Sequence, residues 1–139
     1  MADQDCVFCD IVTGDGAASK VYEDEELLAV MDIRPVTTGH LLVIPKRHSI
    51  GLADLPEDTG AGMWRLGHRL AGALRRSTLR CDGVNFFLAD GEPAGQEVWH
   101  VHLHVIPRFA GDGFRISADW RTPPRADIDA AAEAIRDVV

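Results

Sequence analysis

The sequence lacks the long apolar run that a membrane-spanning helix requires. Its longest apolar stretches, such as residues 41–44, have the length of a strand, whereas a membrane helix takes about 20 residues. The first five residues are acidic and contain no apolar core, so they do not resemble a secretory signal peptide. We therefore expect a cytoplasmic protein with no membrane partner.

Basic residues are also scarce. Fourteen lysines and arginines stand against 22 aspartates and glutamates, which gives a net charge of −8 with histidine neutral. A sequence-independent grip on DNA or RNA needs many contacts from Lys and Arg to phosphates. The composition thus argues against a nucleic-acid polymer as partner, although a small pocket for one phosphate group remains compatible with it.

The number of cysteines is small and odd. Three cysteines in a chain without export signals predict reduced thiols rather than a disulfide framework. The 139 residues are enough for one domain, and a hydrophobic content of 46% is that of a folded globular protein with a core.

The apolar pattern predicts an α+β fold with a mainly antiparallel sheet. One long helix, from Asp54 or Pro56 to about Ser77, follows from apolar residues that recur every three or four positions. A short C-terminal helix is expected over 127–138. The expected strands are two short ones within 20–32, then 39–45, 84–88 and 98–106. Strands and helices do not alternate in a βαβ rhythm, which disfavours a parallel sheet.

Three of the six histidines lie within five residues. His100, His102 and His104 alternate with Val101 and Leu103, so on a strand the three imidazoles would share one face. Such a cluster suits either a catalytic zinc ion or an imidazole that attacks phosphorus. Gly91 and Gly95 in the preceding loop favour the second chemistry, because their backbone can come close to a phosphate.

The segment His100–Ile106 matches the His-φ-His-φ-His-φ-φ signature of the histidine triad (HIT) family of nucleotide hydrolases and transferases, where φ is an apolar residue. Residues 6–11, 32–35, 38–48 and 90–96 also resemble the corresponding segments of this family. The resemblance covers roughly residues 5–108 and implies a HIT domain that forms a homodimer. The remaining tail, 109–139, is expected to pack on the domain or on the dimer partner.

The resemblance also implies a role for individual residues. His102 would attack the α-phosphorus, the carbonyl of His100 would hold the His102 ring in one tautomer, His104 would lie against the phosphate, and His40 would stand behind them. Asp32 would bind the ribose. The base pocket would be lined by Phe8, Ile11, Met31 and Ile33. The loop residues Gly95, Gln96, Glu97 and Val98 would also contact the substrate, with Gln96 and the Gly95 backbone available to the phosphate.

The expected activity is that of a HIT-type hydrolase. It would cleave nucleoside 5′-phosphoramidates or related nucleotide conjugates at the α-phosphorus, through a nucleotidyl-histidine, and release a purine nucleoside monophosphate. One alternative is a dinucleoside polyphosphate hydrolase or phosphorylase, or a nucleotidyl transferase. Another is a nucleotide-binding regulatory module with little turnover.

Two residues of the phosphate loop depart from the family pattern. Ala89 stands where relatives usually place Asn or Gln, and Glu97 stands where Ser or Thr is common. A methyl group cannot donate a hydrogen bond, and a carboxylate beside a phosphate repels it unless it points away. These departures favour a loop adapted to a different leaving group.

Cys6 and Cys9 have the spacing of a zinc knuckle, but two cysteines supply only half of a tetrahedral site. The resemblance implies that His48 and His100 complete a Cys₂His₂ set. Such a zinc ion would be structural, tying the N-terminal segment to the sheet without contact to the phosphorus.

Overall fold

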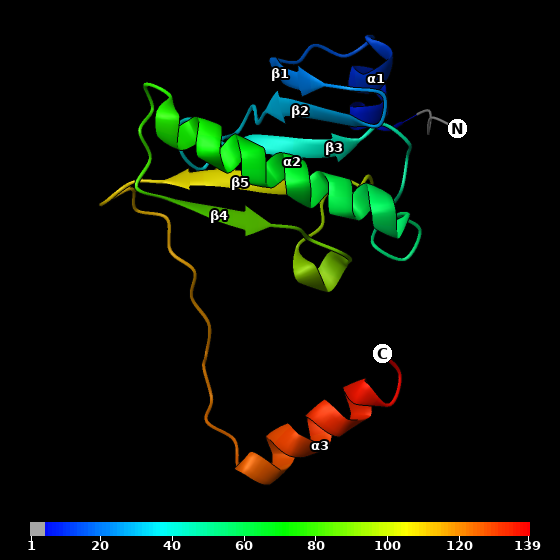
Figure 1. Cartoon of the computed structure of the whole chain (residues 1–139), viewed down its shortest axis with the longest axis vertical. Coiled ribbons are helices and arrows are strands. Elements are labelled where there is room, and N and C mark those ends of the chain that lie inside the picture. Colours follow the sequence, from blue (N-terminus) through cyan, green and yellow to red (C-terminus); the bar gives the residue numbers. More distant parts are fainter. Residues whose placement is uncertain (1–4) are drawn as a thin grey trace.

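A five-stranded antiparallel sheet in the order β1-β2-β3-β5-β4 forms the centre of the computed structural model, which describes residues 5–139 (Figure 1). The elements along the chain are α1 (Val7–Thr13), β1 (Lys20–Glu23), β2 (Leu27–Met31), β3 (Leu41–Pro45), α2 (Glu57–Arg76), β4 (Gly83–Phe87), the 3₁₀ turn η1 (Glu92–Ala94), β5 (Leu103–Arg108) and α3 (Arg125–Arg136). The predicted α+β class is confirmed. Within residues 5–139, no helix is long and apolar enough to cross a membrane.

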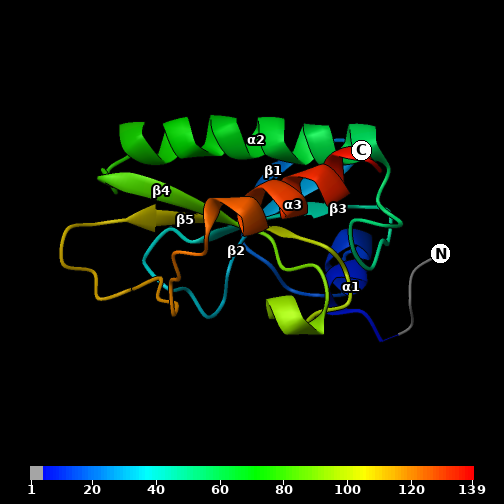
Figure 2. The same cartoon turned by 90° about the horizontal axis from the view of Figure 1, so that it is seen from below.

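The sheet is covered on both faces by unequal layers. α2 lies along one face, whereas the short α1 lies on the other (Figure 2). Alternate residues of β2 and β3 serve the two sides, so that Leu27 and Val43 pack in the cluster that includes α2, while Leu28 and Ile44 pack with α1. Because both faces are buried, these strands read as continuous apolar runs in the sequence.

The long helix forms as its periodicity predicts. The recurring apolar residues Met63, Leu66, Leu70 and Leu74 are buried against the sheet. Gly67 allows this close approach, since a Cβ atom there would lie 3.1 Å from the Phe86 ring and 3.2 Å from Leu103. The glycine is therefore part of the packing between α2 and the sheet.

The strand of the triad is shorter than predicted. β5 begins at Leu103, so residues 98–102 form an irregular segment instead of the first half of a strand. The N–H of Val101 donates to the carbonyl of Ser49 at 2.8 Å, outside the β3–β5 ladder, and the His100 ring is fully buried beside Cys6. The alternation of apolar and polar residues therefore extends over 98–102, although the backbone of these residues is not part of the sheet.

The C-terminal tail runs past β4 and carries α3 away from the sheet (Figure 1). α3 has no buried residue, and its apolar side chains Ile128 and Ile135 are 41% and 61% exposed. The predicted helix exists, but it does not pack on its own domain. Packing on a dimer partner stays a prediction.

Candidate active site

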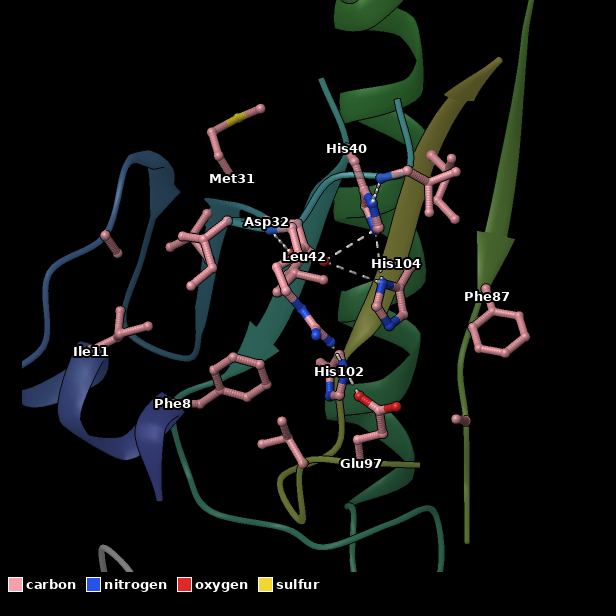
Figure 3. A pocket seen from close by; sticks show the side chains of 18 of the residues that line it. Phe8, Ile11, Met31, Asp32, His40, Leu42, Phe87, Glu97, His102 and His104 are labelled. Carbon is pink, nitrogen blue, oxygen red and sulfur yellow. Dashed lines mark hydrogen bonds and ion pairs between the residues drawn. The ribbon is translucent and has the colours of Figure 1, made fainter. Parts of the chain in front are cut away.

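A cavity of about 460 Å³ opens on the face of the sheet that α2 leaves free. It is bounded by α1, the end of β2, the segment after it, and the loop before β5 (Figure 3). The residues expected to bind substrate all line it, as do three of the four expected catalytic histidines: Phe8, Ile11, Met31, Asp32, Ile33, His40, Gly95, Gln96, Glu97, Val98, His102 and His104. His100 is the exception.

The three triad imidazoles do not share one face. His102 and His104 face the cavity, whereas His100 is fully buried and its ring Nδ1 lies 3.3 Å from the Sγ of Cys6. The expectation of three rings side by side is therefore wrong, because the backbone from 98 to 102 is not a strand. His100 also cannot join His102 and His104 around one catalytic metal.

His102 is held in one tautomer by a backbone carbonyl. Its Nδ1 lies 2.8 Å from the carbonyl oxygen of His100, and since that oxygen can only accept, Nδ1 carries the hydrogen. Nε2 then keeps a lone pair. Burial lowers the pKa of His102 below its ordinary value, which favours the neutral ring at neutral pH. The residue has the protonation state of a nucleophile.

A chain of hydrogen bonds fixes the opposite arrangement in His104. The N–H of Val36 donates to His40 Nδ1 at 3.1 Å, so His40 Nε2 carries the hydrogen and donates to His104 Nδ1 at 2.8 Å. His104 Nε2 then bears a hydrogen on the far side of the ring from His40. Burial, and then repulsion from His102 and His40, lowers the pKa of His104 to about 4. Its ring is thus a neutral hydrogen-bond donor beside His102.

Asp32, His40 and His104 bring three potential metal-ligand atoms close together. Asp32 Oδ2 lies 3.5 Å from His40 Nε2 and 4.0 Å from His104 Nδ1. A metal needs a lone pair from each ring, but His40 Nε2 carries a hydrogen and His104 Nδ1 accepts it. The group is better described as two hydrogen-bonded neutral imidazoles with a carboxylate nearby.

Cys6, Cys9, His48 and His100 form a second cluster, whose four ligand atoms lie within 4.8 Å of one another. His100 Nδ1 lies 3.3 and 3.6 Å from the sulfurs of Cys6 and Cys9, and His48 Nδ1 lies 3.3 Å from that of Cys9. Tetrahedral zinc with ordinary bond lengths places sulfur and nitrogen ligands about 3.5 Å apart. These four residues therefore fit a zinc ion.

The surroundings of His100 support this fit. Its Nε2 lies 2.7 Å from the carbonyl oxygen of Pro45, so Nε2 carries the hydrogen and Nδ1 turns its lone pair toward the thiols. The cluster joins α1, the segment after β3 and the segment before β5. Its ligand atoms belong to side chains outside the cavity, as expected for a structural metal.

The phosphate loop uses its polar groups differently from the prediction. The Gln96 side chain accepts from the N–H of Gly91 at 2.8 Å and donates to the carbonyls of Ile50 and Val98, so its amide is occupied within the protein. The N–H of Gly95 donates to Glu92. Within residues 5–139, the N–H groups of Glu97 and Val98 are among the loop donors without a protein acceptor, and both residues line the cavity.

The two unusual loop residues have separate environments. Ala89 is 5% exposed in the cavity wall. The Glu97 carboxylate lies 3.4 Å from the Arg34 guanidinium at the cavity mouth, and both side chains are at least 80% exposed. This ion pair was not predicted, although Arg34 directly follows the predicted site residue Ile33.

Two further aromatic residues, Phe87 and Phe114, line the cavity and were not predicted. Phe87 ends β4, which pairs with the triad strand and places Phe87 opposite His104. That position was open to prediction from strand pairing. Nothing in the sequence pattern distinguishes Phe114, which the chain brings back to the cavity after β5.

Comparison with known proteins finds one matching family model and several similar structures. The model of the HIT domain matches residues 14–111. A crystal structure from Streptococcus mutans, SMU.412c, is 40% identical with a TM-score of 0.91, covering 98% of this chain and 86% of that chain. A zinc-bound histidine triad protein from Mycobacterium smegmatis is 45% identical with a TM-score of 0.77, covering 97% and 98%.

The adenylylsulfatase HINT3 of Arabidopsis thaliana is a further relative. It is 38% identical over 108 residues, which are 78% of this chain and 54% of that protein. The two-histidine site, the sheet order and these similarities lead to one conclusion: the chain belongs to the histidine triad family.

Proposed function

We propose that this protein hydrolyses nucleoside 5′-phosphoramidates, or related nucleotide conjugates, at the α-phosphorus. The observation that carries the proposal is the tautomer of His102, whose Nδ1 hydrogen bonds to the His100 carbonyl and whose Nε2 keeps a lone pair in a cavity of nucleotide size.

The reaction has two steps. In the first, His102 Nε2 attacks the α-phosphorus and the P–N bond to the leaving amine breaks, while the departing nitrogen takes a proton from a water molecule, which leaves hydroxide. In the second, that hydroxide attacks the phosphorus and the bond from phosphorus to His102 Nε2 breaks. His104 stays neutral in both steps and donates a hydrogen bond from Nε2 to the reacting phosphoryl group. The products are a nucleoside monophosphate and a free amine, and both histidines are in their starting state.

The cavity offers a place for each part of a nucleotide. Phe8 and Ile11 are buried in the cavity wall, and Ile33 is exposed. We place the purine base against these apolar side chains. The Asp32 carboxylate accepts the N–H of Arg34 through Oδ1 and has room to accept a ribose hydroxyl. The backbone N–H groups of Glu97 and Val98 serve the phosphate.

A related substrate is suggested by the Arabidopsis relative, whose name describes a hydrolase of adenylylsulfate. Cleavage there also occurs on a nucleotide, with a sulfate in place of an amine as leaving group. The assay described next also distinguishes three other activities. These are cleavage of dinucleoside polyphosphates, transfer of the nucleotidyl group to phosphate, and nucleotide binding with little turnover.

The test is a pre-steady-state assay with adenosine 5′-phosphoramidate. We expect a burst of ammonia in the first turnover. Peptides are then analysed by mass spectrometry at alkaline pH, because phospho-imidazole bonds survive there, and the adenylyl group should be found on His102. His102→Asn should lower kcat by at least about a thousandfold while AMP still binds. The control is His68→Asn, which changes an exposed histidine of α2.

Three outcomes point elsewhere. An adduct on another residue, or full activity of His102→Asn, rejects the assignment of the nucleophile. Formation of ADP in phosphate buffer identifies a phosphorylase. Tight AMP binding with no turnover of phosphoramidate, adenylylsulfate or dinucleoside polyphosphate identifies a regulatory module.

The quaternary structure and location also belong to this proposal. We propose a homodimer, since β4 is an edge strand of the described sheet and its Phe87 is 51% exposed. Light scattering should give twice the mass of the chain, and the mass of one chain would contradict the dimer.

A cytoplasmic location stays a prediction, which fractionation of the host cell tests.

A further inference from the structure

The second half of α2 and the turn after it are strongly basic, although the chain as a whole carries a net charge of −8. Residues 59–81 contain no aspartate or glutamate, whereas five of the 14 lysines and arginines lie there: Arg65, Arg69, Arg75, Arg76 and Arg80. Basic residues in the last turn of a helix are favoured by the helix dipole. Arg69 lies in the middle of α2, so the dipole does not account for it.

Two of these arginines line a groove of about 490 Å³ between α2 and the edge strand β1. Its walls include Val21 and Tyr22 of β1 and Arg69, Gly72, Ala73 and Arg76 of α2. The groove lies on the side of the sheet that α2 covers, whereas the candidate active site lies on the other side (Figure 2). An anion in the groove is therefore separated from the histidines by the sheet.

The two guanidinium groups approach the same groove from different directions. The guanidinium carbon of Arg69 lies 5.2 Å from the centre of the Tyr22 ring, which holds the side chain toward β1. The Arg76 side chain folds back over Gly72, where an added Cβ atom would lie 2.9 Å from Nη1 of Arg76. Gly72 stands between the two arginines in the helix, so the missing side chain gives Arg76 its place in the groove.

Neither guanidinium has an acidic partner in the part of the chain that the structure describes. The ion pairs among residues 5–139 include neither Arg69 nor Arg76, and no aspartate or glutamate lines the groove. Two like charges in one groove repel each other, and a bound anion removes that repulsion. Each guanidinium also presents paired N–H groups whose geometry matches the oxygens of a phosphate.

Acidic residues beside the groove limit the length of the anion. Residues 23–26, which follow Tyr22, are all acidic, and the Tyr22 hydroxyl donates to Asp24 at 2.8 Å. A long polyanion such as RNA would continue from the groove onto this turn and be repelled by it. Arg69 and Arg76 are seven residues apart, or about 10 Å along the helix, which linked phosphates can bridge.

We propose that Arg69 and Arg76 bind a short chain of phosphate groups in this groove, at a site separate from the active site. The ligand is either an inorganic polyphosphate or the phosphate chain of a nucleoside di- or triphosphate. Each guanidinium holds one phosphate, and the small residues Gly72 and Ala73 leave room for the chain between them. The proposal does not depend on the proposed hydrolysis, because no residue of the groove lines the catalytic cavity.

Tyr22 provides a local measurement, because it is the only tyrosine of the chain. In protein labelled with ¹³C at tyrosine, NMR should show one set of ring signals, and titration with inorganic tripolyphosphate should shift them saturably. Orthophosphate should bind at least about tenfold more weakly, since one phosphate cannot engage both guanidinium groups at full strength. Added salt should weaken the binding of both anions.

Substitutions test the two arginines separately. Arg69→Gln and Arg76→Gln should each raise the Kd for tripolyphosphate about five- to tenfold, measured by calorimetry at low ionic strength. Arg75→Gln is the matched control, because it removes the same charge from an exposed position of α2 outside the groove lining. It should change the Kd less than about twofold. Circular dichroism verifies that each variant is folded.

Three results overturn the groove site. Tyr22 signals that do not move, or a Kd that neither groove variant changes, would place tripolyphosphate elsewhere in the protein. Equal effects of Arg75→Gln and Arg76→Gln would show a response to the general charge of α2 instead of a site. A shift caused by an RNA oligonucleotide or an acidic peptide, but not by tripolyphosphate, would identify a surface for a macromolecule.

ADP distinguishes the two sources of the phosphate chain. If ADP shifts the Tyr22 signals with the same Kd as pyrophosphate, the groove recognises the phosphate chain alone. If the Kd of ADP is at least about tenfold lower, the nucleoside also contacts the groove, and the ligand is a nucleotide.

Discussion

Each cavity histidine has one ring nitrogen committed to a fixed partner, and that partner decides what the other nitrogen can do. The His100 carbonyl leaves His102 Nε2 with a lone pair, as the proposed nucleophile requires, whereas the Val36 N–H, acting through His40, leaves His104 Nε2 with a hydrogen to donate. The residue types in the sequence allow either tautomer for both rings. The assignment of roles comes from the acceptors and donors that the fold places beside them.

Charge at the cavity mouth gives a prediction at the same scale. Among the described residues that line the cavity, Arg34 is the only one with a permanent positive charge, and Glu97 pairs with it. Glu97→Gln should release Arg34 for the phosphate and lower the Kd for AMP about two- to fivefold at low salt, whereas Arg34→Gln should raise it by a similar factor. Calorimetry at low and high salt measures both effects.

Adenosine is the control ligand, since it lacks the phosphate and its affinity should not follow the charge at position 97. If Arg34→Gln binds AMP as the unmodified protein does, Arg34 does not reach the phosphate. If Glu97→Gln weakens AMP binding, the carboxylate is a contact of the substrate instead of a competitor for Arg34.

At the scale of elements, local periodicity predicted α2 and α3 well, missed the short helix α1, and predicted one strand that is too long. α2 lies where its apolar spacing placed it, because one helix face against one sheet face is a local pattern. The alternation of 98–106 is equally regular, yet the backbone of 98–102 turns out of the sheet and buries His100 beside Cys and His side chains from two distant segments. Alternation alone does not indicate whether a neighbouring strand is present.

The glycines of α2 make this scale testable. Gly72→Ala adds a Cβ atom that meets only the mobile end of Arg76, so we expect the free energy of unfolding to rise by about 0.5–1 kcal/mol from helix propensity. Gly67→Ala gains the same propensity but pushes against Phe86 and Leu103, so it should stabilise less than Gly72→Ala or destabilise. Urea unfolding followed by circular dichroism measures the difference. Equal gains would mean that α2 does not lie so close to the sheet.

At the scale of the whole molecule, the Cys₂His₂ cluster joins segments that are up to 94 residues apart in the chain. If it holds zinc, the purified protein should contain about one equivalent of zinc per chain. Chelation or Cys9→Ser should lower Tm by about 5–10 °C, because metal binding stabilises only the folded chain. Elemental analysis and thermal unfolding measure the two quantities.

The control for the metal is Cys81→Ala, which removes the third cysteine from the core beside α2 and should leave the zinc content unchanged. A metal-free preparation with a Tm that chelators do not alter would show that the cluster is not a zinc site. If chelation stops turnover while the protein stays folded, the metal would be catalytic and would bind in the cavity instead of at this cluster.

The sequence by itself determined the α+β class through its hydrophobic period and the family through its histidine motif, because both are patterns of neighbouring residues. The resemblance to that family also named 12 of the 22 residues that line the cavity. The tertiary structure alone decided where His100 points, that the Gln96 amide is occupied by Ile50, that Glu97 meets Arg34, and that Phe114 returns to the cavity. These partners are 46 to 94 residues apart in three of the four cases. Such contacts depend on how the segments pack, which local sequence patterns do not encode.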